Sequence, residues 1–88
     1  MRWTVTLTRP AQRQLRRLPP QVQDRILGYL HTTVASADDP ARHGKALKGV
    51  FQGQTSFRVG AYRIVAEIIR PTATVRVARI AHRKDAYD

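Results

Sequence analysis

The sequence contains no cysteine, which excludes disulfide bonds and thiolate metal sites and is compatible with a reducing compartment. It has only six acidic residues, and because these are scattered they predict no carboxylate cluster for a divalent cation. The few glycines do not form a phosphate-binding loop, since Gly44 and Gly49 fit neither the Walker spacing nor the dinucleotide-binding spacing. We therefore expect no metal and no cofactor.

Long apolar runs are absent as well. No stretch approaches the roughly 20 apolar residues that span a bilayer, and the N-terminal residues alternate instead of forming the apolar run of a signal peptide. No predicted helix joins a strongly apolar face to a lysine-lined one, which disfavours binding to a membrane surface. We expect a cytoplasmic protein without a membrane partner.

Positive charge is what the sequence has in excess. Sixteen lysines and arginines against six acidic residues give a formal net charge of +10, and thirteen of the sixteen cations are arginine. A field of this sign attracts polyanions, so nucleic acid is the first partner class and an acidic protein the second. Because 42% of the residues are hydrophobic, we expect a folded chain, with a single domain over residues 1–88.

The N-terminal half is predicted to contain one strand and a helical hairpin. Residues 2–7 alternate with the period of a strand, and Thr8 is a suitable N-cap for a helix that runs to about Leu18. Pro19-Pro20 must end this helix and can begin the next one. The second helix carries an apolar ladder of Val22, Ile26, Leu30 and Val34.

The C-terminal half is predicted to contain three strands, at residues 54–59, 62–69 and 74–82. Residues 35–49 show no clear periodicity and are expected to form a long connection. The resulting order, β-α-α-β-β-β, predicts an α+β domain with the helical hairpin packed on one face of a four-stranded, largely antiparallel sheet. The second face of such a sheet is open.

The predicted hairpin of residues 57–65 holds two arginines on rigid backbone. Arg58 and Arg63 stand on its two arms, which a tight Gly60-Ala61 turn joins. Tyr62 falls on the opposite face from Arg63 and is assigned to packing.

The register of the last two strands is a separate hypothesis. If Glu67 pairs with Arg79, the same register sets Arg63 opposite Arg83. Like charges in opposite positions are destabilising, so this pair would indicate an anion between them. A slip of one residue would undo the arrangement.

Several short motifs follow one another along the chain. They are Trp3-Thr4-Val5-Thr6-Leu7-Thr8, the Leu18-Pro19 helix break, Gly44-Lys45-Ala46-Leu47-Lys48-Gly49, Arg58-Val59-Gly60-Ala61-Tyr62-Arg63 and His82-Arg83-Lys84-Asp85-Ala86-Tyr87. In this order and spacing, over nearly the whole length of a basic chain, they resemble the RelE-type toxins of bacterial type II toxin–antitoxin systems (the RelE/ParE superfamily).

The resemblance implies a ribosome-dependent endoribonuclease that cuts mRNA in the decoding site and so inhibits translation. The reaction implied is attack of a 2′-hydroxyl on the adjacent phosphate, which gives a cyclic phosphate and a free 5′-hydroxyl. The partners implied are a cognate antitoxin protein, the ribosome with its mRNA and ribosomal RNA, and operator DNA only through the toxin–antitoxin complex.

Such a cleavage needs positive charge at the phosphorane, a base for the 2′-hydroxyl and help for the leaving oxygen. Matching of the motifs to the family assigns the charge to Arg63, Arg58 and Arg83 and adds the near-terminal Tyr87, which could stack on a base or orient the nucleophile. Arginine remains protonated, so the base must come from elsewhere. The candidates for the base are Lys45, Lys48, His82 and Tyr87.

One position departs from the family pattern. Some members carry another lysine or arginine two residues before the position of Arg58, where this chain has Ser56. Lys45 or Lys48 is the candidate to compensate for the missing cation.

Further RNA contacts and two other functions remain open. Arg13, Arg16 and Arg17 form a charge run that is either a solvated helix face or, with Lys84, a contact to ribosomal RNA phosphates. The alternatives to the ribonuclease are a ParE-type inhibitor of DNA gyrase and a non-catalytic basic module that binds RNA.

Overall fold

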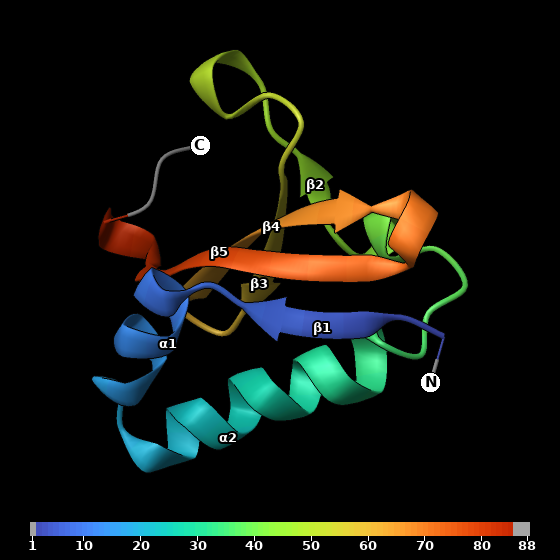
Figure 1. Cartoon of the computed structure of the whole chain (residues 1–88). Coiled ribbons are helices and arrows are strands. Elements are labelled where there is room, and N and C mark those ends of the chain that lie inside the picture. Colours follow the sequence, from blue (N-terminus) through green and yellow to red (C-terminus); the bar gives the residue numbers. More distant parts are fainter. Residues whose placement is uncertain (1, 86–88) are drawn as a thin grey trace.

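The computed structural model describes residues 2–85 (Figure 1). Within them, α1 (Arg9–Arg16) and α2 (Pro20–Tyr29) pack on one face of a five-stranded sheet. The strands are β1 (Thr4–Leu7), β2 (Lys45–Ala46), β3 (Thr55–Val59), β4 (Tyr62–Ile69) and β5 (Thr74–His82), in the spatial order β1-β5-β4-β3-β2. β1 runs parallel to β5, and every other neighbouring pair is antiparallel. The predicted α+β architecture is confirmed.

The sheet has one strand more than predicted. β2 lies inside the segment 35–49, which was expected to form a loop, and it pairs with β3. Two residues are too short to show an alternation in the sequence, and the strand exists only because β3 offers hydrogen-bonding groups beside it. The same segment also forms a short 3-10 turn at Pro40–His43.

Local capping sets the start of α1. The Thr8 side chain accepts a hydrogen bond from the backbone N–H of Ala11 (3.3 Å) and donates one to the carbonyl of Ala78 in β5 (3.1 Å). The first bond satisfies an orphan donor of the helix, and the second ties the helix start to the sheet.

The second helix ends differently from the prediction. α2 is regular to Tyr29, and a π-helical turn continues it over Leu30–Val34. The ladder residues Ile26, Leu30 and Val34 are nevertheless all buried. Near the junction the Thr32 hydroxyl donates to the carbonyl of Gly28 (2.7 Å), a side-chain contact of the kind that perturbs the helical ladder.

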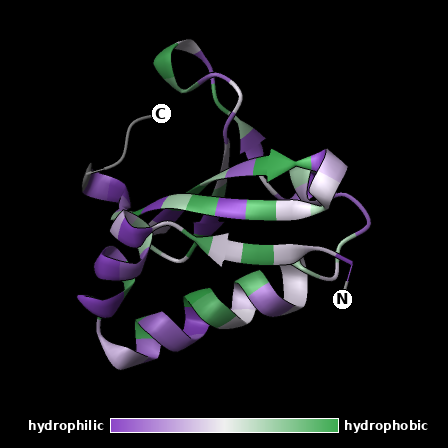
Figure 2. Ribbon diagram, viewed as in Figure 1, coloured by the Kyte–Doolittle hydropathy of each residue, from purple (hydrophilic) through white to green (hydrophobic). Residues whose placement is uncertain are grey.

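The core lies between the helices and the sheet. Phe57, Ile64, Val75 and Val77 point from the strands toward the helices and are fully buried. Figure 2 shows the matching alternation of hydrophobic and hydrophilic residues along β5 and the largely hydrophilic surface of α1. Trp3 is half-buried against the edge of this cluster.

The predicted register of the last hairpin is wrong. Glu67 pairs with Arg76 instead of Arg79, and Arg63 stands opposite Ala81 instead of Arg83. A bulge between Val65 and Ala66 shifts the pairing along β4. Along β5 the buried positions change phase at the bulge, from Val75 and Val77 to Ile80. The prediction assumed an uninterrupted alternation and therefore missed this three-residue step.

Position 44, just before β2, has no room for a side chain and therefore requires glycine. A Cβ atom there would lie 2.6 Å from Thr55 Cγ2 and 2.8 Å from the carbonyl oxygen of Ser56, so backbone would have to move. We expect Gly44→Ala to destabilise the protein by about 1–3 kcal/mol, as overpacking does, and to displace β2.

Gly28→Ala is the matched control for Gly44→Ala, because nothing lies within 4 Å of a Cβ atom at Gly28 in α2. It should stabilise the helix by up to about 1 kcal/mol. Urea unfolding of the two variants and the parent measures both effects. Equal stability of all three proteins would contradict the assigned packing at Gly44.

Candidate nucleic-acid interface

Arg58 and Arg63 stand directly opposite each other across β3 and β4. Their neighbours Phe57 and Ile64 point into the core, so alternation along each strand directs both arginines to the face that carries no helices. The two-residue turn with Gly60 at φ +59° fixes this pairing, because it sets Val59 opposite Tyr62. The like-charge pair expected for Arg63 and Arg83 is thus formed by Arg58 and Arg63.

A like-charge pair in opposite positions costs stability unless something neutralises it. Two hollows meet at this pair. One, of about 490 Å³, is lined by Lys45, Ala46, Leu47, Lys48, Ser56, Arg58 and Arg63. The other, of about 270 Å³, is lined by Arg58, Tyr62, Arg63, Arg83 and Lys84. We call the two together the cationic groove; among the described side chains no carboxylate lines it.

A lysine on the neighbouring strand lies beside Ser56, the position at which this chain lacks the cation of some family members. Lys45 of β2 pairs with Ser56 of β3, so the two side chains leave the sheet on the same face. The positive charge that position 56 of β3 lacks is therefore supplied by Lys45 on the neighbouring strand β2. Ser56 itself is buried and Lys45 is exposed, so the lysine stands at the mouth of the groove above the small hydroxyl.

Of the candidates for the base that lie within the described residues, the structure brings Lys45 and Lys48 to the arginines but not His82. His82 pairs with Tyr62, and the two rings meet edge to face with centroids 5.2 Å apart. Its Nδ1 accepts a hydrogen bond from the backbone N–H of Lys84 (3.2 Å). His82 lines neither hollow of the groove and instead shapes the turn that carries Lys84.

Tyr62 has two roles, of which the sequence indicated one. It packs against the edge of the core, as predicted, and it also lines the groove beside Arg83. Its position next to the hairpin turn is the signal that could have indicated the second role. Tyr87, assigned to the site from its motif, lies outside the described residues.

The predicted ribosomal RNA contacts are separated in space. Arg13, Arg16 and Arg17 are exposed on α1 and its C-cap, and within the described part of the chain none of them lines the groove. α1 packs against β5 from the helix-covered face, so these arginines form a second cationic surface. Lys84 does line the groove.

Comparison with known proteins identifies the family. The family described as "ParE toxin of type II toxin-antitoxin system, parDE" matches residues 5–87. The chain is also 33% identical to Toxin RelG of Mycobacterium tuberculosis (strain ATCC 25618 / H37Rv) over 87 residues, which cover 99% of this chain and 98% of the relative. The chain belongs to the RelE/ParE superfamily of toxins. The resemblance noted in the sequence is confirmed.

Solved structures of the superfamily share the fold of this RelE/ParE toxin. A chain of the RelBE2 toxin–antitoxin complex from Mycobacterium tuberculosis is 30% identical and superposes with a TM-score of 0.85 over 93% of this chain and 99% of that one. A chain of the archaeal RelE–RelB complex from Pyrococcus horikoshii OT3 is 19% identical, with a TM-score of 0.77 over 98% of this chain and all of that one. At that lower identity the likeness concerns the fold alone.

No helix in residues 2–85 is long and apolar enough to cross a membrane. In the same part of the chain, no three His, Asp or Glu side chains gather closely enough to hold a metal ion.

Proposed function

We propose that this RelE/ParE toxin is an endoribonuclease that cleaves mRNA on the ribosome and so inhibits translation. The observation that carries the proposal is the Arg58–Arg63 pair at the centre of an open groove without acidic lining residues among the described side chains. Two guanidinium forks held on paired strands suit the non-bridging oxygens of one phosphate. An RNA backbone bound there would offset the repulsion between the two arginines.

The reaction requires one bond to form and one to break. The 2′-oxygen attacks phosphorus and loses its proton to a base, while the P–O5′ bond breaks and the leaving 5′-oxygen takes up a proton. Arg58 and Arg63 stabilise the charge that develops on the phosphorane, and Arg83 lies at the end of the groove that they share. Lys45 and Lys48 are the base candidates that the groove contains.

We also propose that a cognate antitoxin neutralises the toxin. The similar chains from Mycobacterium tuberculosis and Pyrococcus horikoshii were both solved as toxin–antitoxin complexes. A net charge of +10 favours an acidic partner segment, which would order itself on the toxin surface as it binds. Co-expression with the protein encoded by the neighbouring gene tests this: restored growth supports the proposal, and undiminished toxicity contradicts it.

Inhibition of DNA gyrase is the second candidate. The observation that favours it is the matching family itself, which is described by the ParE toxin. A gyrase inhibitor acts by binding and does not need the groove's cations to stabilise a transition state. Strong inhibition in a supercoiling assay, without mRNA cleavage on ribosomes, would select this candidate.

Mapping of mRNA 5′ ends after induction of the toxin in a bacterium tests the main proposal. We expect new ends inside translated codons, carrying a 5′-hydroxyl, within minutes of induction. The ends should be absent when an Arg63→Gln variant is induced to the same level. Arrested growth with unchanged transcripts would contradict the ribonuclease.

The pairing of Lys45 with Ser56 leads to a prediction of its own. Lys45→Ser should reduce cleavage by about 10- to 100-fold, because it removes one of the cations that surround the phosphate. Adding Ser56→Lys in the same protein should restore most of the lost rate, since the two side chains share a face of adjacent strands. Single-turnover cleavage of ribosome-bound mRNA measures both variants.

The control for this pair of variants is Ser56→Lys alone. It should retain activity, and its melting temperature shows whether the larger side chain fits. A double variant that folds but is no more active than Lys45→Ser would mean that Lys45 acts as a positioned base instead of as a source of charge.

A further inference from the structure

A third hollow, of about 500 Å³, lies on the same open face of the sheet. Its lining includes Phe51, Gln52, Gln54, Val65, Glu67 and Arg79. We call it the Phe51 pocket. It differs from the cationic groove in composition, because it joins an aromatic ring to a guanidinium, a carboxylate and two amides.

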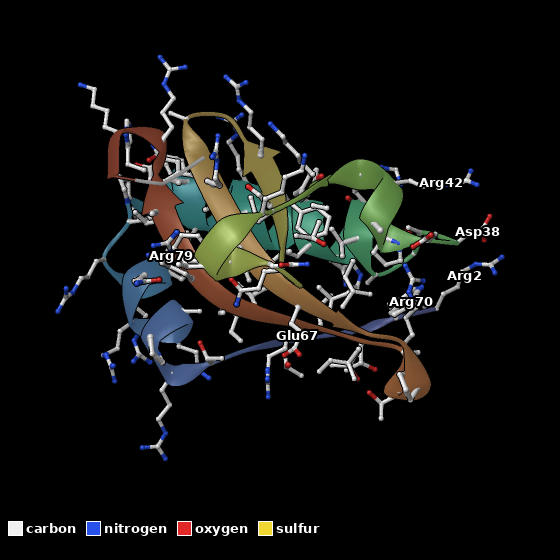
Figure 3. All side chains as sticks on the ribbon, turned by 90° about the horizontal axis from the view of Figure 1, so that it is seen from above. Arg2, Asp38, Arg42, Glu67, Arg70 and Arg79 are labelled. Carbon is white, nitrogen blue, oxygen red and sulfur yellow. The ribbon has the colours of Figure 1, made fainter. Side chains whose placement is uncertain are left out.

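A stacked pair forms one wall of this pocket. The guanidinium carbon of Arg79 lies 5.3 Å from the centroid of the Phe51 ring, within the range of a cation–π contact. Figure 3 shows Arg79 on β5 next to the yellow-green turn that contains Phe51, and Glu67 farther along the sheet. Residues from distant parts of the sequence therefore build the wall together.

The loop that carries Phe51 has a defined shape. A 3-10 turn spans Gly49–Phe51. Its first residue, Gly49, and the following Gly53 have φ angles of +69° and +94°, which favour glycine. The backbone N–H of Gln54 donates to the carbonyl of Phe51 (3.1 Å). The carbonyl of Gln54 accepts a hydrogen bond from the N–H of the buried Leu47 (2.9 Å). These bonds fix the loop, which Figure 1 shows projecting from the sheet on the side away from the helices and Figure 2 shows with a hydrophobic tip.

The Phe51 pocket adjoins the cationic groove. Val65 lines the pocket, and its two neighbours across the sheet are Ser56, which lines the groove, and Arg79. Val65 and Arg63 are two positions apart on β4, which corresponds to about 6.6 Å. A nucleotide whose phosphate lies on the Arg58–Arg63 pair therefore has the pocket within the reach of a neighbouring base.

We propose that the Phe51 pocket binds the nucleobase of a nucleotide next to the cleaved phosphate and contributes to the choice of cleavage site. This inference rests on the proposed ribonuclease function. Unstacked RNA bases bind proteins by stacking on aromatic rings and arginine planes, which Phe51 and Arg79 provide. The Glu67 carboxylate, oriented by its ion pair with Arg76 (2.6 Å), and the amides of Gln52 and Gln54 present acceptors and donors for a base edge.

A nucleobase fits this lining better than a segment of an acidic partner does. The Glu67 carboxylate would repel an acidic side chain, whereas it can accept a hydrogen bond from an exocyclic amino group. The ring of Phe51 adds a flat apolar surface that a phosphate or carboxylate cannot use.

Cleavage of a randomised mRNA library on ribosomes tests the proposal. We expect the parent protein to favour particular bases next to the cut, and Phe51→Leu and Arg79→Gln to flatten that preference while total cleavage falls less than about tenfold. Arg70→Gln is the control for the charge change, since the exposed Arg70 pairs with Asp39 (3.2 Å) at the other end of β4. Unchanged base preferences in both pocket variants, with cleavage intact, would overturn the inference and leave the ribonuclease standing.

A binding experiment separates the two proposals if the parent protein does not cleave. Single-stranded RNA oligonucleotides that each lack one base are titrated at low salt against the parent protein and Phe51→Leu. One abasic position should weaken binding to the parent by about tenfold and leave binding to the variant unchanged. Equal losses for both proteins, or an effect of Phe51→Leu on antitoxin neutralisation alone, would overturn the assignment of a base.

Discussion

Replacing Arg63 by glutamine should lower the rate of ribosome-dependent mRNA cleavage by at least about 100-fold, while binding to the ribosome falls by much less. The reason is that Arg63 stands at the junction of the two hollows, where the proposed reaction would develop charge on the phosphorane in the transition state. Loss of a single pre-organised donor to such a charge costs about 10²- to 10³-fold in rate. Single-turnover cleavage on programmed ribosomes, with ribosome binding measured separately, checks the prediction.

Arg70→Gln again provides the matched control for Arg63→Gln. It removes the same charge outside the groove and should leave the cleavage rate within about twofold of the parent. If Arg63→Gln lowered the rate only in proportion to the lost affinity, the groove would be a binding surface and the protein a non-catalytic RNA-binding module.

Arg58 should act together with Arg63. Because the two guanidinium groups stand on directly paired residues, we expect both to contact the same phosphate, and the losses from Arg58→Gln and Arg63→Gln should then not add in the double variant. Arg58→Gln should not lower the melting temperature, since it removes a repulsion between like charges. A fall in melting temperature would mean that the activity loss reports unfolding.

Replacing Phe57 by alanine should have the largest effect on stability. Phe57 is fully buried in β3, directly beside Arg58 in the sequence, and its ring meets Tyr29 of α2 edge to face with centroids 6.4 Å apart. Such a truncation costs about 3–5 kcal/mol, a large part of the roughly 5–15 kcal/mol that stabilises a typical domain. We expect the urea midpoint to fall sharply and the variant to be partly unfolded at growth temperature.

Val50→Ala is the control for the loss of a hydrophobic side chain. Val50 is 93% exposed, so its truncation should change stability by no more than about 0.5 kcal/mol. If Phe57→Ala cost less than about 1 kcal/mol, the ring could not be the packing centre that holds the arginine hairpin on α2.

Local signals were sufficient for much of the architecture. Alternation at residues 2–7, the Thr8 cap and the Pro19-Pro20 break mark elements whose cause lies within a few residues, and the structure contains each of them. The Gly60-Ala61 turn also determines that Arg58 faces Arg63, because a two-residue turn leaves one register for the strands beside it. The net charge of +10 likewise follows from the composition alone.

The tertiary structure decided what the chain brings together over long distances. The sequence by itself determined the order of elements, the net charge and the arginine hairpin, since these depend on propensity, counting and a local turn. Only the fold placed Lys45 beside Ser56, packed the His82 ring against Tyr62 and set Arg79 against Phe51. The physical reason is that a two-residue strand is selected by the hydrogen bonds and packing of neighbouring strands, which no local pattern encodes.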